Sequence, residues 1–562
     1  MGGSRLQLYS VGVENNHLTK NPEISYFKKV YKKYSNFALQ SIDQYFEKID
    51  TLDFNNVTNI KLKFGKNGNL IHKIFLEINI PAIVNKKDNI QYEWAENLGE
   101  IIVKNARILI GGEIIESYDD KYMYIYNNLS ETSEKKKMRR EMNHIVNRNR
   151  FSGGDKLYTK QGDSKKYINA HHNNVPSILD KKIIIPLPFW FHRNVGCSLP
   201  IQNLLYHDVI LEVELRPIKE LINYYDITHA KQSVANLKNY SYLKSTSHLN
   251  LDNTDINNIF LNKSWDINPV LNTTYIFLDD EEAKQFNNST LKYLVEPIKI
   301  YKEKDVAGQI SLKEGLSSEL PQHMCKEFIV AAQRTDINNT NNWLNFSNLD
   351  FSEMDVFFMQ NYLLQLAKSG FYEDTNDPNS LNTNLVENLS RFVSPTDMTL
   401  NSDEWKLLDE NLVLRQSDTL TDSDIKLLLN MWKFRNYDNI PVITRQKQSF
   451  YSDEIIKDMS LFFDETKRIN KRNMNYYNLL QQFMHHNNYI KNINMYSFSL
   501  SPDSYQPGGK INFEHLGGIT LDVNTKEPYN YGEDYLYNIL IYFRYYNILE
   551  IKSGMADLLF RN

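Results

Sequence analysis

Alternation of apolar and polar residues is the dominant pattern along the chain, and it predicts β-strands. Residues 208–215 (DVILEVEL) place four aliphatic side chains on one face, and a register shift of one residue would expose that whole face. Residues 70–80 (LIHKIFLEINI) alternate in part and stop before Pro81. Residues 101–110 (IIVKNARILI) run into Gly111-Gly112 and a further apolar stretch, which indicates a β-hairpin.

Helical periodicity is scarce, and residues 279–286 (DDEEAKQF) are the best short candidate because acidic side chains fill the first turn. The 36 tyrosines and 28 phenylalanines bring the aromatic fraction to 12%. Aromatic residues favour strands, and Asn-rich runs such as residues 338–342 favour turns. We therefore expect an all-β protein with long loop insertions. A chain of 562 residues fits two large β-domains, since β-sandwiches often use roughly 200–250 residues each.

Two short sequence marks occur in the same order in both halves of the chain, which predicts a duplicated domain. The marks pair residues 73–76 with 326–329, and residues 103–110 plus Glu113 with residues 456–463 plus Glu465. They lie 31 positions apart in the first half (73 to 104) and 131 in the second (326 to 457), a difference of 100. This difference places a large insertion near residues 345–450. The segment is polar and acidic, so we expect it on the outer surface.

The charge balance argues against a protein that wraps nucleic acid. Lys and Arg total 64 against 69 Asp and Glu, a net charge of −5, whereas a strongly basic face would be expected for that role. Two cysteines exclude a disulfide framework and favour a reducing compartment.

Targeting signals are also missing from the sequence pattern. The N-terminus lacks a secretory signal, and the most apolar run, residues 183–191, is too short to cross a bilayer. Gly2 invites a myristoylation motif, but Leu6 stands where that motif needs Ser or Thr. We expect a soluble, cytoplasmic protein.

Several residue clusters are candidate chemical sites. They are His171-His172, His485-His486, Cys197 and Cys325, the turn at residues 65–68, and the basic run at residues 135–140. Adjacent histidines on a strand point to opposite faces and do not easily chelate one metal. The cysteines lack a CxxC context and are expected to be buried thiols, and the turn lacks the phosphate-loop motif. For the basic run, a solvated loop ranks first, an intersubunit contact second and nucleic acid third. No catalytic, cofactor-binding or metal-ligating residue is predicted, and the protein is not expected to be an enzyme.

Residues 18–38 (LTKNPEISYFKKVYKKYSNFA) resemble the N-terminal signature of the major capsid proteins of nucleocytoplasmic large DNA viruses. Further marks resemble that family in its order. They are Gly111-Gly112, the segment from Pro186 to Val209, the segment from Tyr275 to Phe286, the segment from Tyr496 to Phe513, and the end from Tyr546 to Met555. Long insertions and Ala556-Asp557 after Met555 depart from the family pattern, which leaves open whether the role is that of the major shell protein.

The resemblance implies two tandem eight-stranded jelly-roll β-sandwiches with a boundary near residues 286–292. The implied divisions are an N-terminal arm at 1–24, a first jelly roll at 25–288 with insertions near 131–175 and 219–266, and a second at 289–562 with the insertion near 345–450.

The function implied by the resemblance is that of a structural capsid protein. Homotrimers with a pseudo-hexagonal outline would tile the icosahedral shell of a large double-stranded DNA virus, assembled in the host cytoplasm. Implied partners are neighbouring trimers and minor capsid proteins, with an inner membrane close by and no direct contact with nucleic acid. One alternative is a minor capsid or scaffolding paralogue of the same fold. Another, from a different class, is a jelly-roll carbohydrate-binding protein or enzyme.

Overall fold

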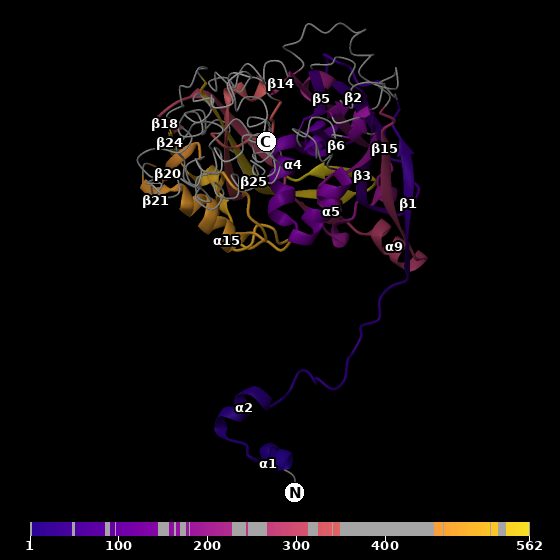
Figure 1. Ribbon diagram of the computed structural model, residues 1–562. Coiled ribbons are helices and arrows are strands. Elements are labelled where there is room, and N and C mark those ends of the chain that lie inside the picture. The colour runs from indigo at the N-terminus through magenta and orange to yellow at the C-terminus, as the bar shows by residue number, and fades with distance from the viewer. Residues whose placement is uncertain are drawn as a thin grey trace.

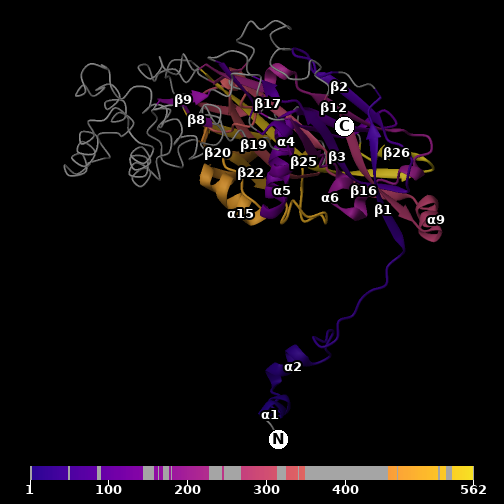
Figure 2. The same ribbon diagram turned by 45° about the vertical axis from the view of Figure 1, so that its right-hand side comes forward.

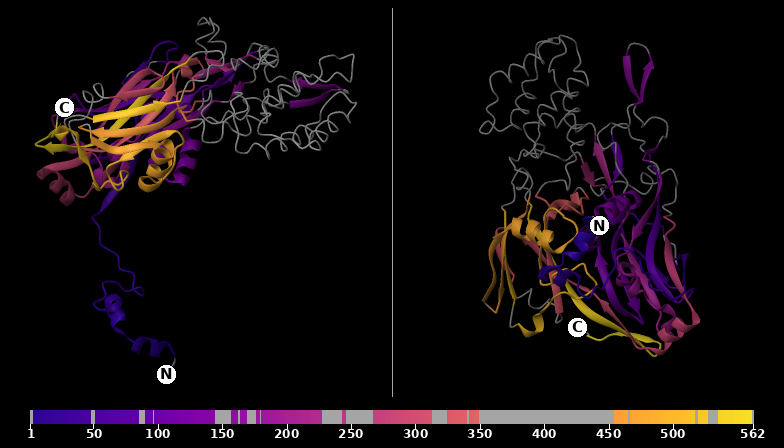
Figure 3. Two further views of the ribbon diagram at one scale, coloured as in Figure 1. Left: turned by 90° about the vertical axis from the view of Figure 1, so that its left-hand side faces the viewer. Right: turned by 90° about the horizontal axis from the view of Figure 1, so that it is seen from below.

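The chain forms two β-sandwiches and a long N-terminal arm that leaves one end of the body (Figure 1). The computed structural model describes residues 3–47, 51–84, 90–95, 97–143, 157–161, 164–168, 176–178, 180–226, 243–245, 267–312, 324–339, 341–348, 454–464, 466–516, 519–526 and 535–560. Seen from below, the strands of the two halves lie side by side as two bodies (Figure 3).

The first sandwich consists of two antiparallel sheets of four strands each, in the orders β1-β15-β3-β11 and β2-β12-β6-β7. The first sheet comprises β1 (Phe37–Tyr45), β15 (Val270–Leu278), β3 (Leu70–Ile80) and β11 (Lys181–Pro186). The second comprises β2 (Thr58–Lys63), β12 (Val209–Leu215), β6 (Val103–Ile110) and β7 (Glu113–Asp119). The apolar face predicted for β12 is buried, from Val209 to Leu215 at every second residue. The hairpin predicted at Gly111-Gly112 is the β6–β7 turn.

The second sandwich repeats this plan with the sheet orders β16-β25-β19-β22 and β18-β24-β20-β21. The long strand β25 also pairs with β17 and β26, and β19 pairs with β23. The first sheet comprises β16 (Leu291–Val295), β17 (Ile298–Val306), β25 (Tyr537–Lys552), β26 (Met555–Leu558), β19 (Met324–Arg334), β22 (Ile493–Ser497) and β23 (Ile511–Asn512). The second comprises β18 (Gln309–Leu312), β24 (Ile519–Thr525), β20 (Ile456–Phe463) and β21 (Thr466–Asn473).

The predicted duplication is confirmed by the strand orders. The first sequence mark lies on β3 in one sandwich and on β19 in the other, and both are the third strand of their sheet. The second mark lies on β6 and on β20, which again hold the same position. Each pair of weakly similar segments therefore has the same place in the same topology.

The sheet that contains β19 and β25 is buried on both faces. Along β19, Phe328 and Val330 belong to the core of the second sandwich. The intervening Ile329 and Ala331 belong to a core cluster built mostly from the first sandwich. Because successive residues of a strand point to opposite faces, this sheet packs against its own partner sheet on one side and the first sandwich on the other. It is the layer that joins the two sandwiches.

The helices partly match the expectation from sequence. The predicted acidic helix is confirmed as α9 (Asp280–Asn288), and Asp279 caps it by accepting a hydrogen bond from the Glu282 N–H at 2.9 Å. The sequence did not indicate α4 (Asp120–Ser130) or α5 (Ser133–Asn143). The basic run at residues 135–140 lies in α5, so the preferred interpretation as a loop is wrong. α5 has almost no apolar residue, so it carries no helical stripe that sequence periodicity could detect.

The remaining elements are short. The α-helices are α1 (Gly3–Tyr9), α2 (Val13–Thr19), α3 (Leu98–Ile101), α6 (Trp190–Arg193) and α15 (Gln481–His485). The 3₁₀ turns are η1 (Val195–Cys197), η2 (Ile201–Asn203), η3 (Ile218–Glu220), η5 (Thr335–Asn339) and η8 (Phe513–His515), and η7 (Asn475–Leu480) is a π-helical turn. The accessory strands are β4 (Ile83–Val84), β5 (Ile90–Trp94), β8 (Leu157–Gln161), β9 (Ser164–Ile168), β10 (Pro176–Ile178), β13 (Ile222–Asp226) and β14 (Leu243–Ser245).

The insertion expected near 345–450 lies outside the described residues from residue 349 onward, as do His171-His172 and much of the insertions near 131–175 and 219–266. The division of the chain into domains therefore stays a prediction. Within the described part of the chain, no helix has the length and apolar character needed to cross a bilayer.

Candidate functional site

A cluster of buried charges lies where the two sandwiches meet. Glu327 on β19 and Arg544 on β25 are directly opposite in the strand register and form an ion pair. Both side chains are almost fully inaccessible, as is that of Lys326. Glu296, which follows β16, and Arg193 from α6 of the first sandwich complete the centre of the cluster.

Glu296 is the acceptor that links the halves. Its carboxylate receives Lys326 Nζ at 2.5 Å, Arg193 Nη1 at 2.9 Å and Arg544 Nη2 at 3.0 Å. Burial alone would raise the pKa of the Glu296 carboxyl, but the three cations outweigh it and hold this pKa at about 2. Because Arg193 belongs to the first sandwich and the other residues to the second, this shared carboxylate ties the two bodies together.

His486 extends the cluster toward α15. Its Nε2 lies 3.1 Å from Glu327 Oε2 and its Nδ1 lies 2.8 Å from Asp503 Oδ2, so both ring nitrogens can donate only as the imidazolium. Burial would lower the pKa of His486, but the two carboxylates raise it to about 9. Burial would likewise raise the pKa of Glu327, yet Arg544 and His486 hold it well below its usual range. Burial, aided by the charge of Arg544, lowers the pKa of Lys326 to about 8.

Aromatic rings surround the charges and also cross the junction. The ring of Tyr122 on α4 lies 5.4 Å from Tyr118 and 5.6 Å from Tyr542 of β25. The Arg193 guanidinium lies 4.5 Å from the ring centroid of Tyr126. Apolar walls lower the local dielectric and strengthen the ion pairs, but they also make any unpaired charge costly.

A second contact between the sandwiches lies near η3. Trp343 Nε1 donates to the Glu220 carbonyl at 2.8 Å, and the Arg216 guanidinium stacks 4.1 Å from the centroid of the Trp343 ring. Asn341 Nδ2 donates to the carbonyls of Lys219 at 2.8 Å and Ile222 at 3.0 Å. Two separated contacts, both well packed, fix the angle between the sandwiches.

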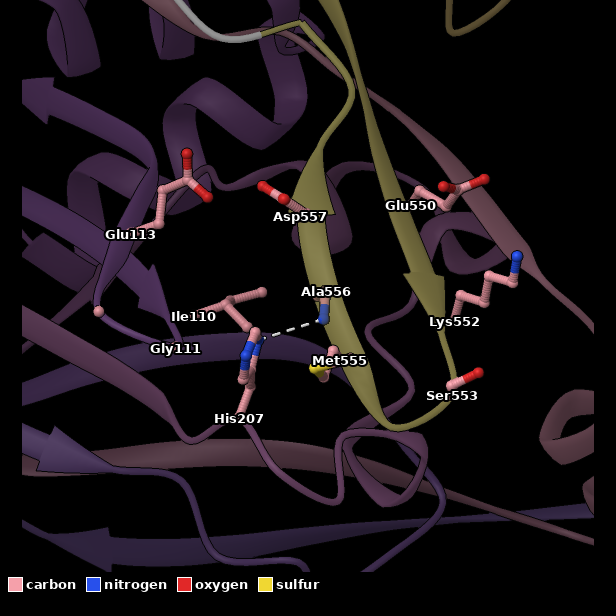
Figure 4. A pocket seen from close by; sticks show the side chains of 11 residues that line it. Ile110, Gly111, Glu113, His207, Glu550, Lys552, Ser553, Met555, Ala556 and Asp557 are labelled. Atoms are coloured by element: carbon pink, nitrogen blue, oxygen red, sulfur yellow. Dashed lines mark hydrogen bonds between the residues drawn. The ribbon is translucent and has the colours of Figure 1, made fainter.

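A pocket of about 670 Å³ opens between the β6–β7 turn of the first sandwich and the β25–β26 hairpin of the second (Figure 4). His207 Nδ1 accepts a hydrogen bond from the Ala556 N–H at 3.2 Å. Glu113 and Asp557 face each other across the opening, one from each sandwich (Figure 4). A Cβ at Gly111, whose φ is +60°, would lie 2.7 Å from the ring of His207. The turn therefore packs tightly against the residue that contacts Ala556 of the hairpin.

The pocket lies between the two sandwiches, where the surface of one meets that of the other. Its lining mixes carboxylates with Lys552, and the described residues hold no cluster of three or more His, Cys, Asp or Glu side chains suited to a metal ion. Its polar side chains come from the β6–β7 and β25–β26 hairpins and from His207.

The N-terminal arm is the most exposed part of the described chain. Residues 3–36 carry no buried side chain, and Figures 1 and 2 both show them extending away from the body. Large apolar side chains on the arm are exposed by 58–100%, including Leu18, Phe27 and Tyr31. Exposed apolar side chains in such number mark an interaction surface.

The structure assigns roles to the sequence candidates that it describes. Cys197 and Cys325 are buried free thiols, as expected, and burial raises the pKa of each. His486 is a member of the ionic cluster, while His485 Nδ1 contacts the Leu500 carbonyl at 3.0 Å. In the basic run, Arg139 is buried and pairs with Glu131 at 2.7 Å and with Glu100. The turn at residues 65–68 connects β2 with β3, and Tyr275 Oη donates to the Gly65 carbonyl at 2.6 Å.

Sequence reasoning missed the cluster itself. The available signal was a charge inside an apolar strand: Arg544 interrupts the run YNILIYFRYYNILEI, and Lys326-Glu327 interrupt MCKEFIVAA. A buried charge needs a partner. The identity of the partners depended on the fold, because Arg193 and Glu296 are distant from both strands in the sequence.

Comparisons with known proteins agree along the whole chain. The family model described as "Major capsid protein N-terminus" matches residues 25–262, and the one described as "Large eukaryotic DNA virus major capsid protein" matches residues 282–557. The major capsid protein of Phaeocystis pouchetii virus is 25% identical and that of Chrysochromulina ericina virus 24% identical, each over 100% of both chains.

Solved structures share the fold. The capsid protein in the PBCV-1 virus capsid gives a TM-score of 0.57 at 17% identity, covering 96% of this chain and all of that one. The Faustovirus major capsid protein gives 0.54 at 10% identity, covering 96% and 94%. The predicted double jelly roll is thereby confirmed. The chain belongs to the major capsid protein family of the large eukaryotic DNA viruses and is a structural component of the virion.

Proposed function

We propose that three copies of this chain associate into a homotrimer with a pseudo-hexagonal outline, and that such trimers tile an icosahedral shell. The observation that carries the proposal is the duplicated sandwich joined by a buried junction. Three chains with two sandwiches each supply six similar bodies, which is the number that a hexagonal tile requires. A fixed angle between the two sandwiches of each chain would keep the six sandwiches of a trimer in a regular hexagonal arrangement.

The junction supports this role because it is built from groups that tolerate little displacement. Glu296 accepts from three cations at once, and a small rotation of one sandwich would break the bond from Arg193. Removing one partner from such a buried set costs roughly 3–5 kcal/mol. The double unit therefore behaves as one building block and not as two bodies on a hinge.

The same proposal covers the surroundings of the trimer. Its partners are neighbouring trimers and minor capsid proteins, with an inner membrane close by, and assembly takes place in the host cytoplasm. We further propose that the role is purely structural, without catalysis or direct contact with nucleic acid. The segment near 345–450 would be an outward-facing insertion of the second jelly roll.

Two measurements test the proposal. Light scattering of the purified protein at micromolar concentration should give the mass of three chains, and a stable monomer would contradict the trimer. Quantitative mass spectrometry of purified virions should count this chain among the most abundant capsid proteins. A copy number far below that of another protein of the same fold would instead favour the minor capsid or scaffolding role.

A further inference from the structure

The arm contains a segment whose sequence pattern and structure disagree. Residues 24–34 contain six large apolar residues, and five of them, all but Tyr26, recur at spacings of three and four, which is the period of an α-helix. On a helix these five would fall within an arc of about 120°. They are Ile24, Phe27, Val30, Tyr31 and Tyr34.

Four lysines occupy the opposite side of the same helix. Lys28, Lys29, Lys32 and Lys33 are two adjacent pairs separated by one helical turn. The segment is therefore a basic amphipathic helix by pattern, a type that is characteristic of membrane surfaces.

In the structure this segment forms no helix. Residues 24–36 have no regular secondary structure, and the five apolar side chains are exposed by 69–100%. Isolated helices shorter than about 12–15 residues are marginal in water, and most of their stability in proteins comes from packing of the apolar face. The segment lacks a surface that would cover that face.

The charge of the arm differs from that of the rest of the chain. Residues 3–36 hold six Lys or Arg and two Glu, a net charge of +4, so the remaining residues carry −9 of the total of −5. The lysines of residues 28–33 are exposed. Helix α9, with its acidic first turn, lies near the point where the arm joins the body (Figure 1). The arm thus presents positive charge away from an acidic body.

We propose that residues 24–34 fold into an amphipathic helix on an anionic lipid surface. The aromatic and aliphatic face would enter the boundary between headgroups and acyl chains, and the lysines would contact the anionic headgroups. The inference rests on the proposed shell role only in that a shell brings many arms to one bilayer, which raises the total affinity of short segments.

Lipid fits this segment better than a protein surface does. Lysine is depleted at protein interfaces, whereas it is characteristic of helices that bind anionic membranes. A groove on another protein would use the apolar face but would leave the four lysines without a role. An anionic bilayer would contact both the apolar face and the lysine face of the helix.

Vesicle co-sedimentation with the full-length protein tests the proposal. The probes are vesicles of phosphatidylcholine alone and of phosphatidylcholine mixed with phosphatidylserine. We expect binding to the mixed vesicles, weakened by salt, and a gain of helical circular dichroism on binding. The variant K28Q/K29Q/K32Q/K33Q should lose on the order of 100-fold or more in partitioning. Val30→Pro keeps every charge but blocks the helix, and it should also lose most of the binding.

A matched control removes the same charge elsewhere. K135Q/K137Q/K304Q/K457Q changes four exposed lysines of the body, and it should bind vesicles like the unaltered protein. Light scattering on each protein reports trimer formation separately, so a failure of the trimer proposal is distinguishable from a failure of lipid binding.

Any of the following outcomes would overturn the proposal. They are no binding to the vesicles that contain phosphatidylserine, a loss of binding in the body variant equal to that in the arm variant, full binding by Val30→Pro, and formation of the helix by the arm without lipid. An arm variant that lowers the oligomer mass in lipid-free buffer would assign the segment to a protein partner instead. Competition by duplex DNA as strong as that by anionic vesicles would assign it to nucleic acid.

Discussion

Strands β3 and β19 hold the same position in the two sandwiches, but their surroundings differ. On β3, Lys73 is exposed and the next residue, Ile74, is fully buried, as in a strand with one solvated face. On β19, the corresponding Lys326 and Glu327 are both fully buried. The outer face of β3 is partly open to water, with Lys73 and Asn79 exposed, whereas the outer face of β19 meets the first sandwich.

The difference shows how a duplicated fold becomes a single building block. Topology and core pattern are retained in both copies, while the outer face of one sheet has become an interface with paired charges. An apolar interface would have been at least as stable, since buried ion pairs rarely add net stability. The buried ion pairs instead form only when the two sandwiches are correctly positioned, so they select one relative orientation of the sandwiches.

The largest expected effect comes from removing the central cation of the interface. Arg544→Met should lower the free energy of unfolding by about 3–5 kcal/mol, because Glu296 and Glu327 would remain buried with fewer partners. Lys73→Met on the equivalent strand should change it by less than about 0.5 kcal/mol. Chemical denaturation of both variants measures the contrast. Similar losses in the two variants would mean that the two outer faces do not differ as described.

The pH dependence of stability should reveal the same interface. The pKa of His486 is raised from 6.5 to about 9, so its stabilising contribution is fully present below pH 6.5 and is lost as the pH rises through about 9. The pKa of Lys326 is lowered from 10.5 to about 8, so the cost of its buried charge is relieved as the pH rises from about 8 to 10.5.

Burial raises the pKa of Glu131 to about 7, so most of its effect on stability is complete by that pH. Between pH 7 and 8 the histidine is therefore the main contributor, and stability should fall by about 1.4 kcal/mol. Denaturant titrations of the unaltered protein and of His486→Gln between pH 7 and 8 measure this slope, most of which should disappear in the variant. On the acid side, the pKa of Glu296 is lowered from 4.5 to about 2, so its contribution is lost as the pH falls through that range. A His486→Gln variant that keeps the alkaline slope would contradict the assignment.

A smaller effect on stability is expected at the β6–β7 turn beside the pocket, where Gly112 provides a matched control for Gly111. Gly111→Ala should destabilise by about 1–2 kcal/mol, because a Cβ there would clash with the ring of His207 and the φ of +60° disfavours other residues. Gly112→Ala shares the positive φ but has open space around the new Cβ, so its loss should be smaller. Thermal unfolding ranks the two variants. Equal losses would indicate that backbone strain alone, and not the contact with the His207 ring, sets the cost.

The fold was more predictable from the sequence than the interface. The alternation of apolar and polar residues predicted β12 and its buried face. Weak internal similarity predicted that β3 is equivalent to β19 and that β6 is equivalent to β20. These features are local or repeated, so the sequence displays them directly. The ionic cluster depends on contacts between Arg193, Glu296 and Arg544, which are brought together only by the packing of the two sandwiches. α5 was also missed, since its contacts involve Arg139 and not an apolar stripe.

Cryo-electron microscopy of the purified protein tests the central claim most directly. We expect particles of three chains in which six sandwiches form a hexagonal outline, with Arg193, Glu296 and Arg544 inside each chain and not between chains. Monomers, or assemblies in which the angle between the two sandwiches of one chain varies from particle to particle, would contradict it.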